Sequence, residues 1–543
     1  MRKKKNSAYP VGSNLLDEVW SLGLTIYLFA ILLIFPVYIH DKYWDMALNK
    51  WKIYYHATTR FAIFVGIMLV IWGGYKIYRR KRYGEKPAID RLSLPDRAMV
   101  FYSALVLLSF GLCNNRQAAW QGIDGWYMGV LAQLMFIGSY FVFSRRVFST
   151  GLLLGFHGGA ALFAGFYAIC QRVDFDWMYL YWDMPAEVLR DYISTIGNRT
   201  WFSGYLCTAF PIGIYFYWYL QGKMKRIAST IVLLLMFMCM VSVGSDSIFV
   251  ALAAVFYILF LFSVGDWERS KRLLEIVGIW FLAGTLMQVL RATIAVEPPD
   301  IRGISGIFLS GSLSVIGFLI VAVLWVGISL LDGTIPSEWK RQQVYWDSNK
   351  KKRVQRIILI STGILLWGIL VLIALNTSGV LQQLFGVSIQ NKYLLFDDNW
   401  GDYRGHTWKL TMKMLWEMPP GQKLLGVGAD CYAYYAYSNT EYAEALQYFW
   451  GNSVMANAHN EWLNSLVCYG ILGGLAYIGC FVTVAYNCLK GTGKDNVNPL
   501  APAVGLCVVA YMAHNFFCYQ QICATPIMFI LMGAAMNVLK KKD

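Results

Sequence analysis

Apolar residues along this chain gather into long runs that short polar segments separate. A helix needs about 20 mostly apolar residues to cross the roughly 30 Å hydrocarbon core of a membrane. Fourteen runs approach this length, at approximately residues 21–39, 61–78, 98–113, 127–143, 149–170, 201–220, 227–243, 248–264, 273–290, 312–331, 357–375, 461–486, 499–518 and 526–539. The pattern therefore predicts an all-α membrane protein, a polytopic bundle of about 12–14 transmembrane helices.

Basic residues occupy every second polar segment between these runs. The clusters are Arg2–Lys5, Arg79–Arg82, Arg145–Arg146, Lys223–Arg226, Arg269–Arg272, Lys350–Arg353 and Lys540–Lys542. Lys and Arg accumulate in cytoplasmic loops, so we expect both termini to be cytoplasmic. The loops at 171–200, 291–311 and 376–460 are then extracytoplasmic. The first run has no small-residue cleavage site, and we expect it to be a membrane anchor.

The segment 376–460 is far longer than an ordinary connection between helices. It is rich in Tyr and Trp and has little low-complexity sequence, so we expect a folded, partly helical cap. This divides the chain into three parts. They are an N-terminal transmembrane bundle of about eleven spans at 1–375, the extracytoplasmic loop at 376–460, and the C-terminal transmembrane helices at 461–543.

The composition supports the membrane assignment and excludes other classes of protein. Hydrophobic residues make up 57% of the chain and charged residues 15%, whereas soluble domains carry about 25% charged residues. The net charge of +15 comes from separate short clusters, which argues against a nucleic-acid partner because such proteins gather basic residues on one face. Most of the 11 cysteines lie in or beside apolar runs, so no disulfide framework can be inferred.

A histidine stands where the long outer loop joins the twelfth run. His459, Leu463, Leu466 and Gly470 recur at helical spacing, so we expect His459 to crown one face of a helix capped by Asn457. The helix dipole would keep the imidazole neutral and able to accept a proton from a hydroxyl. A hydrogen-bonded structural histidine is the commoner outcome when such a residue stands alone.

Two arginines fall on the same side of the membrane as this histidine. Arg404 lies in the long loop, and Arg199 lies at the outer end of the sixth run. The planar guanidinium matches phosphate oxygens. The alternatives are an ion pair of Arg404 with Asp398 or Asp402, and simple snorkelling of Arg199 to the lipid headgroups. Together with a neutral histidine, the two arginines form the set needed to hold a pyrophosphate and activate a hydroxyl.

Several short motifs accompany these residues over roughly residues 195–480. They are Gly197-Asn198, Arg404 with Trp408, Gly426-Val427-Gly428, His459-Asn460, the spaced Leu463 and Leu466, and Gly470 with Gly473. The combination resembles the O-antigen ligase / O-antigen polymerase family of bacterial polytopic membrane glycosyltransferases. That family has an outer-loop His-Asn before spaced leucines and a Gly-x-x-Gly helix, after an Arg-x-x-x-Trp and a Gly-x-Gly turn.

The resemblance implies transfer of a glycan from a polyprenyl-pyrophosphate-linked oligosaccharide to a hydroxyl of a glycan or lipid-glycan acceptor. The reaction would occur on the outer face of the bacterial inner (plasma) membrane, among membrane lipids, during surface-polysaccharide assembly. The implied enzyme is inverting, metal-independent and free of cofactors, with 376–460 as its catalytic loop. The implied catalytic residues are His459 and Arg404, and the implied substrate-binding residues are Arg199, Asn198, Asn460, Trp408 and Gly428.

The chain departs from the family at one turn. The family often has a Ser-Arg pair there, but Gly244–Ser247 contains no arginine, and Arg199, Arg291 or Arg302 could replace it. His514-Asn515 resembles a further histidine of the family, although we expect a packed, hydrogen-bonded side chain. The aromatic residues between Tyr432 and Trp450 could be sugar platforms or core. The pair Asp397-Asp398 leaves weak metal binding open.

Three other functions are compatible with a polytopic helical protein. A transporter or flippase of lipid-linked glycans usually carries ionisable residues at mid-membrane, and the centres of these runs have few. A cell-wall glycan polymerase of the shape–elongation–division type relies on an outer-loop aspartate, for which Asp430 is the nearest candidate. A non-catalytic scaffold is the third. Within the favoured family, a ligase and a polymerase share the same chemistry and differ in the acceptor.

Overall fold

The computed structural model describes residues 11–84, 91–295, 300–334, 348–391, 393–492 and 497–540. The basic residues Arg2–Lys5, Lys541 and Lys542 lie outside these ranges. In the described residues almost all regular structure is helical, and the strands are a pair of two residues each. The expectation of an all-α protein is therefore confirmed.

Nine helices in the described ranges are long and apolar enough to cross a membrane. The first of them, Leu15–Val37, comprises most of α1 (Val11–Leu28), a π-helix η1 (Phe29–Ile34) and α2 (Phe35–Val37). The other eight are α3 (Met46–Tyr83), α4 (Leu94–Leu112), α7 (Thr150–Arg172), α11 (Lys223–Ser242), α13 (Trp267–Thr293), α15 (Leu313–Thr334), α17 (Ser348–Thr377) and α23 (Glu461–Leu489). They indicate a multi-pass membrane protein.

The remaining predicted runs are shorter apolar helices. These are α6 (Val130–Phe143), α12 (Ser247–Ser263), α24 (Leu500–His514) and α25 (Thr525–Lys540). The sixth run is broken into α9 (Arg199–Leu206) and α10 (Phe210–Tyr219). Pro211 lies in the first turn of α10, where its missing N–H leaves no helical hydrogen bond unmade. Each of the fourteen runs thus corresponds to a helix or to this broken pair.

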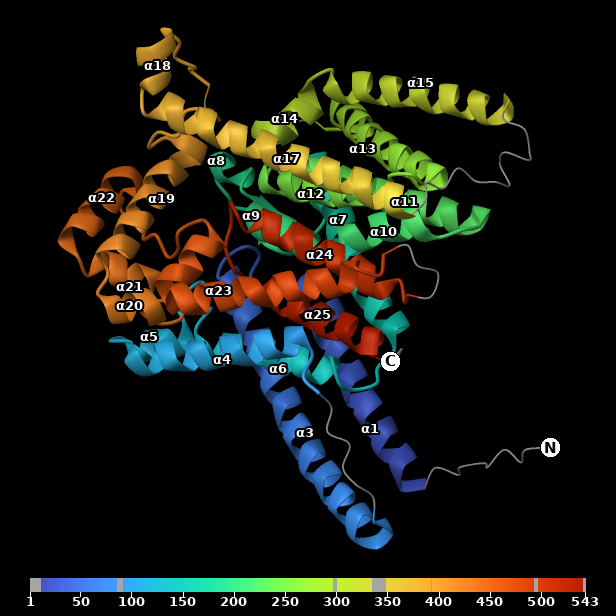
Figure 1. The fold of residues 1–543 in the computed structure, drawn as a ribbon, viewed down its shortest axis with the longest axis vertical. Coiled ribbons are helices and arrows are strands. Elements are labelled where there is room, and N and C mark those ends of the chain that lie inside the picture. The colour runs from blue at the N-terminus through green and yellow to red at the C-terminus, as the bar shows by residue number, and fades with distance from the viewer. Residues whose placement is uncertain are drawn as a thin grey trace.

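The long segment before α23 folds into a helical cap, as expected. Its helices are α18 (Val380–Phe385), α19 (Trp400–Glu417), α20 (Pro420–Leu425), α21 (Tyr432–Tyr437) and α22 (Thr440–Trp450). In Figure 1 the cap, in orange, covers one end of the bundle, and the C-terminal end of α25 points away from it. We call the covered end the cap end.

Short elements in other loops complete the cap end. They are α5 (Arg116–Gln121), α8 (Ala186–Leu189), α14 (Gly303–Ser310) and the antiparallel strands β1 (Tyr192–Ile193) and β2 (Gly197–Asn198). Tyr192 lies opposite Asn198 in this hairpin, and the chain passes from β2 directly into α9. The hairpin therefore fixes where α9 begins.

The loops at each end of the bundle form their own set of polar contacts. At the cap end, cross-loop hydrogen bonds join Asp430 to Ile123 and Met128, Asp246 to Ile304, and Glu461 to Asn515 and Gln520. At the opposite end, which we call the basic end, polar contacts join Arg226 to Glu275, Arg272 to Leu220, Lys351 to Phe262, and Lys540 to Asp96. Two separate sets of loops thus contact one another, one at each end of the bundle.

Helix α23 lies at the centre of the bundle and packs against α4, α24 and α20 (Figure 1). Helices α24 and α25 are almost entirely buried. By contrast, α17 has no buried residue in its apolar stretch, and α3 and α15 have few. These peripheral helices suit a lipid environment. The segment leading into α23 is consequently held by the most rigid part of the protein.

Candidate functional site

His459 lies just before α23 rather than on it. The N-cap of α23 is Asn460, whose Oδ1 accepts hydrogen bonds from the backbone N–H groups of Trp462 (3.0 Å) and Leu463 (3.1 Å). The Oδ1 of Asn457 accepts from the N–H of His459 (3.0 Å), which forms a separate local turn with His459 at φ 49°. The predicted cap at Asn457 and the predicted helical position of His459 are both wrong. Asn side chains stabilise such turns as readily as they cap helices.

The imidazole of His459 is neutral, but not because of a helix dipole. Its ring lies between Trp450 and Tyr519, with centroid distances of 5.8 Å and 5.2 Å. Loss of hydration and the positive charge of Arg404 lower the pKa of His459 to about 3. The side chain can therefore orient a hydroxyl by hydrogen bonding, whereas it is a weak base near neutral pH.

Arg404 lies within electrostatic range of His459, and its guanidinium forms no ion pair with a carboxylate of the described residues. Gly401, Asp402 and Tyr403 all have left-handed φ angles, so the right-handed part of α19 begins at Arg404. Its Nη1 donates to the carbonyl of Gly401 (2.7 Å), and its buried Nε has no hydrogen-bond partner. Among the described residues no carboxylate lies within ion-pair distance of this guanidinium.

The alternative ion pairs of Arg404 are therefore wrong. Asp398 instead pairs with Lys409 at 3.0 Å, and the side chain of Asp402 is exposed. Arg404 also lies within electrostatic range of Cys518 and Tyr519 in the loop between α24 and α25, which we call the 515–524 loop. A buried donor without a partner is costly unless a ligand supplies one. The pattern favours an anion at Arg404.

Arg199 lies at the turn where the resembling family often has arginine. Its Nη1 donates to the carbonyl of Gly244 (3.0 Å), and its Nη2 pairs with Asp191 (3.2 Å). The neighbouring Asn198 is the N-cap of α9, with its Oδ1 occupied by the N–H groups of Thr200 and Trp201. Arg199 therefore lies against the Gly244–Ser247 turn with a carboxylate partner, while Asn198 caps α9.

Three other predicted substrate-binding residues support the site instead of lining it. Asn460 is the N-cap described above. The N–H of Gly428 donates to the carbonyl of Cys468 (3.0 Å), and a Cβ there would lie 2.9 Å from Cβ of Cys113, so Gly428 allows close packing. Trp408 is buried in the cap beside Trp400 and Phe517.

The second histidine is packed and hydrogen-bonded, as expected. His514 is fully buried, with Nε2 2.7 Å from Oγ of Ser203 and Nδ1 2.9 Å from Oδ1 of Asn515. Ser203 in turn contacts Ser245 of the Gly244–Ser247 turn at 3.3 Å. This network joins α9, α24 and the turn beside Arg199, so it fixes the position of Arg199 relative to the 515–524 loop.

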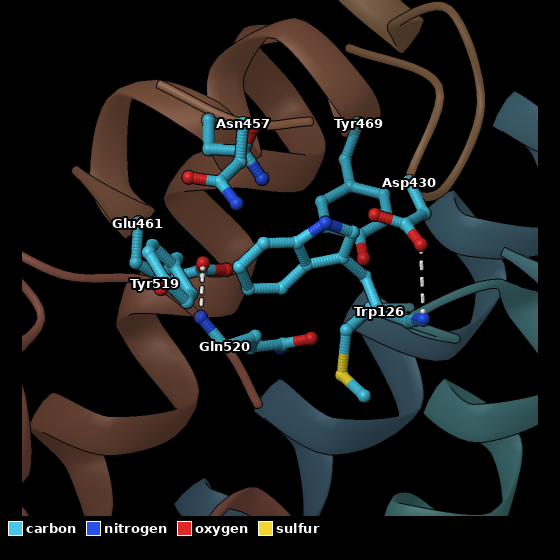
Figure 2. A pocket seen from close by; sticks show the side chains of 9 residues that line it. Trp126, Asp430, Asn457, Glu461, Tyr469, Tyr519 and Gln520 are labelled. Atoms are coloured by element: carbon cyan, nitrogen blue, oxygen red, sulfur yellow. Dashed lines mark hydrogen bonds between the residues drawn. The ribbon is translucent and has the colours of Figure 1, made fainter. Parts of the chain in front are cut away.

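A narrow pocket, shown in Figure 2, is lined in part by Tyr519, whose ring contacts His459. Its lining residues are Trp126, Met128, Asp430, Asn457, Glu461, Asn464, Tyr469, Tyr519 and Gln520. Asp430 Oδ2 accepts from the N–H groups of Ile123 (2.9 Å) and Met128 (3.0 Å), and Glu461 Oε2 accepts from the N–H of Gln520 (2.7 Å). Burial raises the pKa of Asp430 to about 7. Two buried carboxyl groups therefore face one pocket.

Aromatic rings connect this pocket to the start of α9, near Arg199, and to the cap, near His459. The ring centroids of Trp201 and Trp126 lie 5.8 Å apart, and those of Trp126 and Tyr519 lie 4.5 Å apart. Tyr519 then meets His459, which meets Trp450. Of the aromatic residues proposed as sugar platforms, Tyr432 and Tyr442 are buried in the cap, while Trp450 contacts the histidine.

Trp126, Glu461, Tyr519 and Gln520 were not predicted from the sequence. Glu461 directly follows the His-Asn pair, and Gln520-Gln521 is a polar pair just after the thirteenth run. Both are polar residues at the edge of apolar segments. Nothing in the sequence indicated that the 515–524 loop and residues 122–129 (the loop between α5 and α6) line the same pocket.

Neither a protein-family model nor a curated protein sequence matches this chain. Within the described ranges, no three His, Cys, Asp or Glu side chains cluster as a metal site requires. What the arrangement offers chemically is a cation without a counter-ion, a neutral imidazole and two carboxyl groups around aromatic rings. Such a site suits an anionic leaving group beside a polar, hydroxyl-bearing partner.

Proposed function

We propose that this protein is a membrane glycosyltransferase of the O-antigen ligase / O-antigen polymerase type. It transfers a glycan from a polyprenyl pyrophosphate donor to an acceptor hydroxyl on the outer face of the bacterial inner membrane. The observation that carries the proposal is the guanidinium of Arg404, which has no carboxylate partner among the described residues and lies within electrostatic range of the neutral ring of His459. The motif resemblance supplies the substrate class.

In this reaction the acceptor oxygen attacks the anomeric carbon on the side opposite the pyrophosphate. The bond between that carbon and the pyrophosphate oxygen breaks, so the anomeric configuration inverts. Arg404 stabilises the negative charge that develops on the leaving group. His459 orients the acceptor hydroxyl, whose proton passes to a base. The low pKa of the imidazole, about 3, favours orientation over proton abstraction.

Arg199 is the proposed second ligand of the pyrophosphate. Its position against Gly244 supports this, because the family often places an arginine at that turn. The ion pair with Asp191 is partly exposed on both sides, and exposed pairs contribute only about 0–1 kcal/mol. A phosphate can therefore displace Asp191 at small cost, while Arg404 requires no displacement.

The proposed orientation places the cap outside the cell. Basic residues concentrate at the opposite end of the bundle, where Arg145, Arg226, Arg272 and Lys351 lie. The positive-inside rule assigns that end to the cytoplasm. A lipid-linked donor in the outer leaflet then meets Arg404 at the membrane surface.

The test uses the purified protein in proteoliposomes with a polyprenyl-pyrophosphate-linked oligosaccharide and a glycan acceptor. Mass analysis should detect a new glycosidic bond with wild-type protein. Arg404→Ala should lower the rate about 10²–10³-fold, and His459→Ala about 10²-fold or more. Lys409→Ala, on the same helix as Arg404 and paired at the surface with Asp398, is the matched control and should retain the wild-type rate.

Wild-type rates in both site variants would refute the assignment. Movement of the labelled donor across the bilayer without a new glycosidic bond would instead support a flippase. The product also separates the two activities of the family, since extension of a repeat unit indicates a polymerase and capture by a different molecule indicates a ligase.

A further inference from the structure

The pocket beside His459 contains acceptor oxygens that the protein itself leaves unused. Asp430 and Glu461 are 7% and 2% exposed, and each uses only one carboxylate oxygen in hydrogen bonds to the described residues. The Oδ1 of Asn464 is buried and has no hydrogen-bond partner among the described residues. A buried oxygen is normally satisfied, and the second oxygens of Asp430 and Glu461 remain free to accept, so the three groups on one pocket point to a ligand that donates hydrogen bonds.

The same pocket presents flat aromatic surfaces. Trp126 and Tyr519 meet edge to face at 89°, and the indole of Trp126 extends into the middle of the pocket in Figure 2. Aromatic rings combine a large apolar surface with a defined geometry, and sugars offer C–H faces alongside their hydroxyl groups. The lining thus matches the hydroxyl-bearing edge of a sugar better than it matches an anion, because it contains two carboxyl groups and no basic side chain.

We propose that this pocket receives the hydroxyl-bearing edge of the acceptor sugar and that Glu461 accepts the proton of the reacting hydroxyl. This inference rests on the proposed function and names the base that His459 does not provide. Asp430 and Asn464 accept hydrogen bonds from the other hydroxyl groups. As the acceptor oxygen bonds to the anomeric carbon, its proton moves to Glu461 Oε1 and is later released to water, while the electron pair of the broken bond leaves with the pyrophosphate.

Glu461 is the better base of the two carboxylates for a physical reason. Each hydrogen bond donated to a carboxylate stabilises its charged form and weakens it as a base. Glu461 accepts one backbone hydrogen bond, from Gln520, whereas Asp430 accepts two. Glu461 also lies two residues after His459, whose backbone turn is held by Asn457 of the same pocket.

Isosteric variants can separate this chemistry from a structural role. Glu461→Gln keeps a carbonyl oxygen for the N–H of Gln520, and Asp430→Asn keeps one for Ile123 and Met128. The measurement is the initial rate of glycosyl transfer in proteoliposomes against acceptor concentration, at saturating lipid-linked donor. Glu444→Gln, on an exposed position of α22, is the matched control and should match the wild type.

We expect Glu461→Gln to lower kcat about 10²-fold or more, with Tm within about 2 °C of the wild type. Asp430→Asn and Trp126→Ala should instead raise the KM for the acceptor, by about tenfold. Binding of the lipid-linked donor should not change in any of them. A kcat and acceptor KM equal to the wild type in Glu461→Gln would overturn the inference while leaving the proposed function intact.

If Glu461→Gln also lowers Tm, a second measurement decides. Sodium formate added to Glu461→Ala should restore part of the transfer rate if a carboxylate at this position accepts the proton. No restoration would show that Glu461 only holds the 515–524 loop, which overturns the inference. If wild-type protein forms no glycosidic bond, the proposed function itself fails, and this outcome is distinct from both.

Discussion

The two ends of this bundle carry polar networks of opposite character. At the basic end the fully buried Asp96 is saturated. It accepts hydrogen bonds from the N–H of Ser93 (2.9 Å) and the hydroxyl of Tyr140 (2.9 Å), and it pairs with Arg145 (3.1 Å) and Lys540 (3.1 Å). This network joins α4, α6 and α25, so its evident task is to hold helices together.

At the cap end the corresponding groups are left open. Among the described residues, the buried Nε of Arg404 and a buried oxygen of Asn464 have no partner, and Asp430 and Glu461 each use a single oxygen. Fully satisfied buried networks stabilise a fold, whereas partly satisfied ones cost free energy. The cap end is therefore less stable than it could be, and its free hydrogen-bonding groups are those that the proposed ligands require.

The largest expected effect is a loss of stability when the polar network around Asp96 is broken. Asp96→Ala removes the acceptor shared by Arg145 and Lys540, and breaking such a buried pair costs about 3–5 kcal/mol. We expect a lower Tm in detergent and less protein in the membrane. The remaining folded protein should keep its transfer rate per molecule, because Asp96 lies at the end away from the site. A stable but inactive Asp96→Ala protein would break the comparison.

An effect of intermediate size is expected from the binding of pyrophosphate to Arg404 at the cap end. Inorganic pyrophosphate should raise the Tm of the wild-type protein, since a ligand at 100 times its Kd stabilises by about 2.7 kcal/mol. Arg404→Gln should lose this response, and Arg145→Gln should keep it. An equal response in both variants would mean that pyrophosphate does not bind through the unpaired guanidinium.

The smallest expected effect concerns pH. Burial raises the pKa of Asp430 to about 7, above that of the unfolded chain, so the folded protein holds a proton that the unfolded chain releases. The contribution of Asp430 to stability is therefore greatest below about pH 4 and declines as the pH rises to about 7. Asp430→Asn removes this decline.

Thermal unfolding of both proteins at about pH 5 and about pH 8 provides the measurement. The Tm of Asp430→Asn relative to the wild type should be more favourable at the higher pH. A difference that does not vary with pH would show that the carboxyl group titrates normally, and that the pocket is more hydrated than its burial indicates.

The positions of the helices could be predicted from the sequence because lipid imposes one requirement on every span. Each apolar run corresponds to helical structure, and the sixth run is divided into two helices just before Pro211. The start of α23 was placed wrongly because Asn457 and Asn460 are equally good local caps by sequence, and only packing against the 515–524 loop selects between them.

Some of the residues at the candidate site could be predicted from the sequence, and others could not. His459 and Arg404 were found because a histidine and an arginine in one polar loop are conspicuous beside apolar runs. The residues around them were not predicted, because Trp126 and Tyr519 are far from them in the sequence and no local pattern distinguishes these two aromatic residues from others. Gly428, Asn198 and Asn460 were assigned to substrates through the family resemblance, and a motif match does not distinguish a ligand site from a helix cap or a close-packed glycine.

The amino-acid sequence alone determined that this chain is helical, with apolar helices that indicate a multi-pass membrane protein, and where those helices lie along the chain. Hydropathy and charge are sums over neighbouring residues, so they can be read locally. Only the tertiary structure decided that no carboxylate of the described residues pairs with Arg404, that His459 is desolvated between two aromatic rings, and that Glu461 faces Asp430 across one pocket. Those properties depend on which distant segments meet, and therefore on how the helices pack.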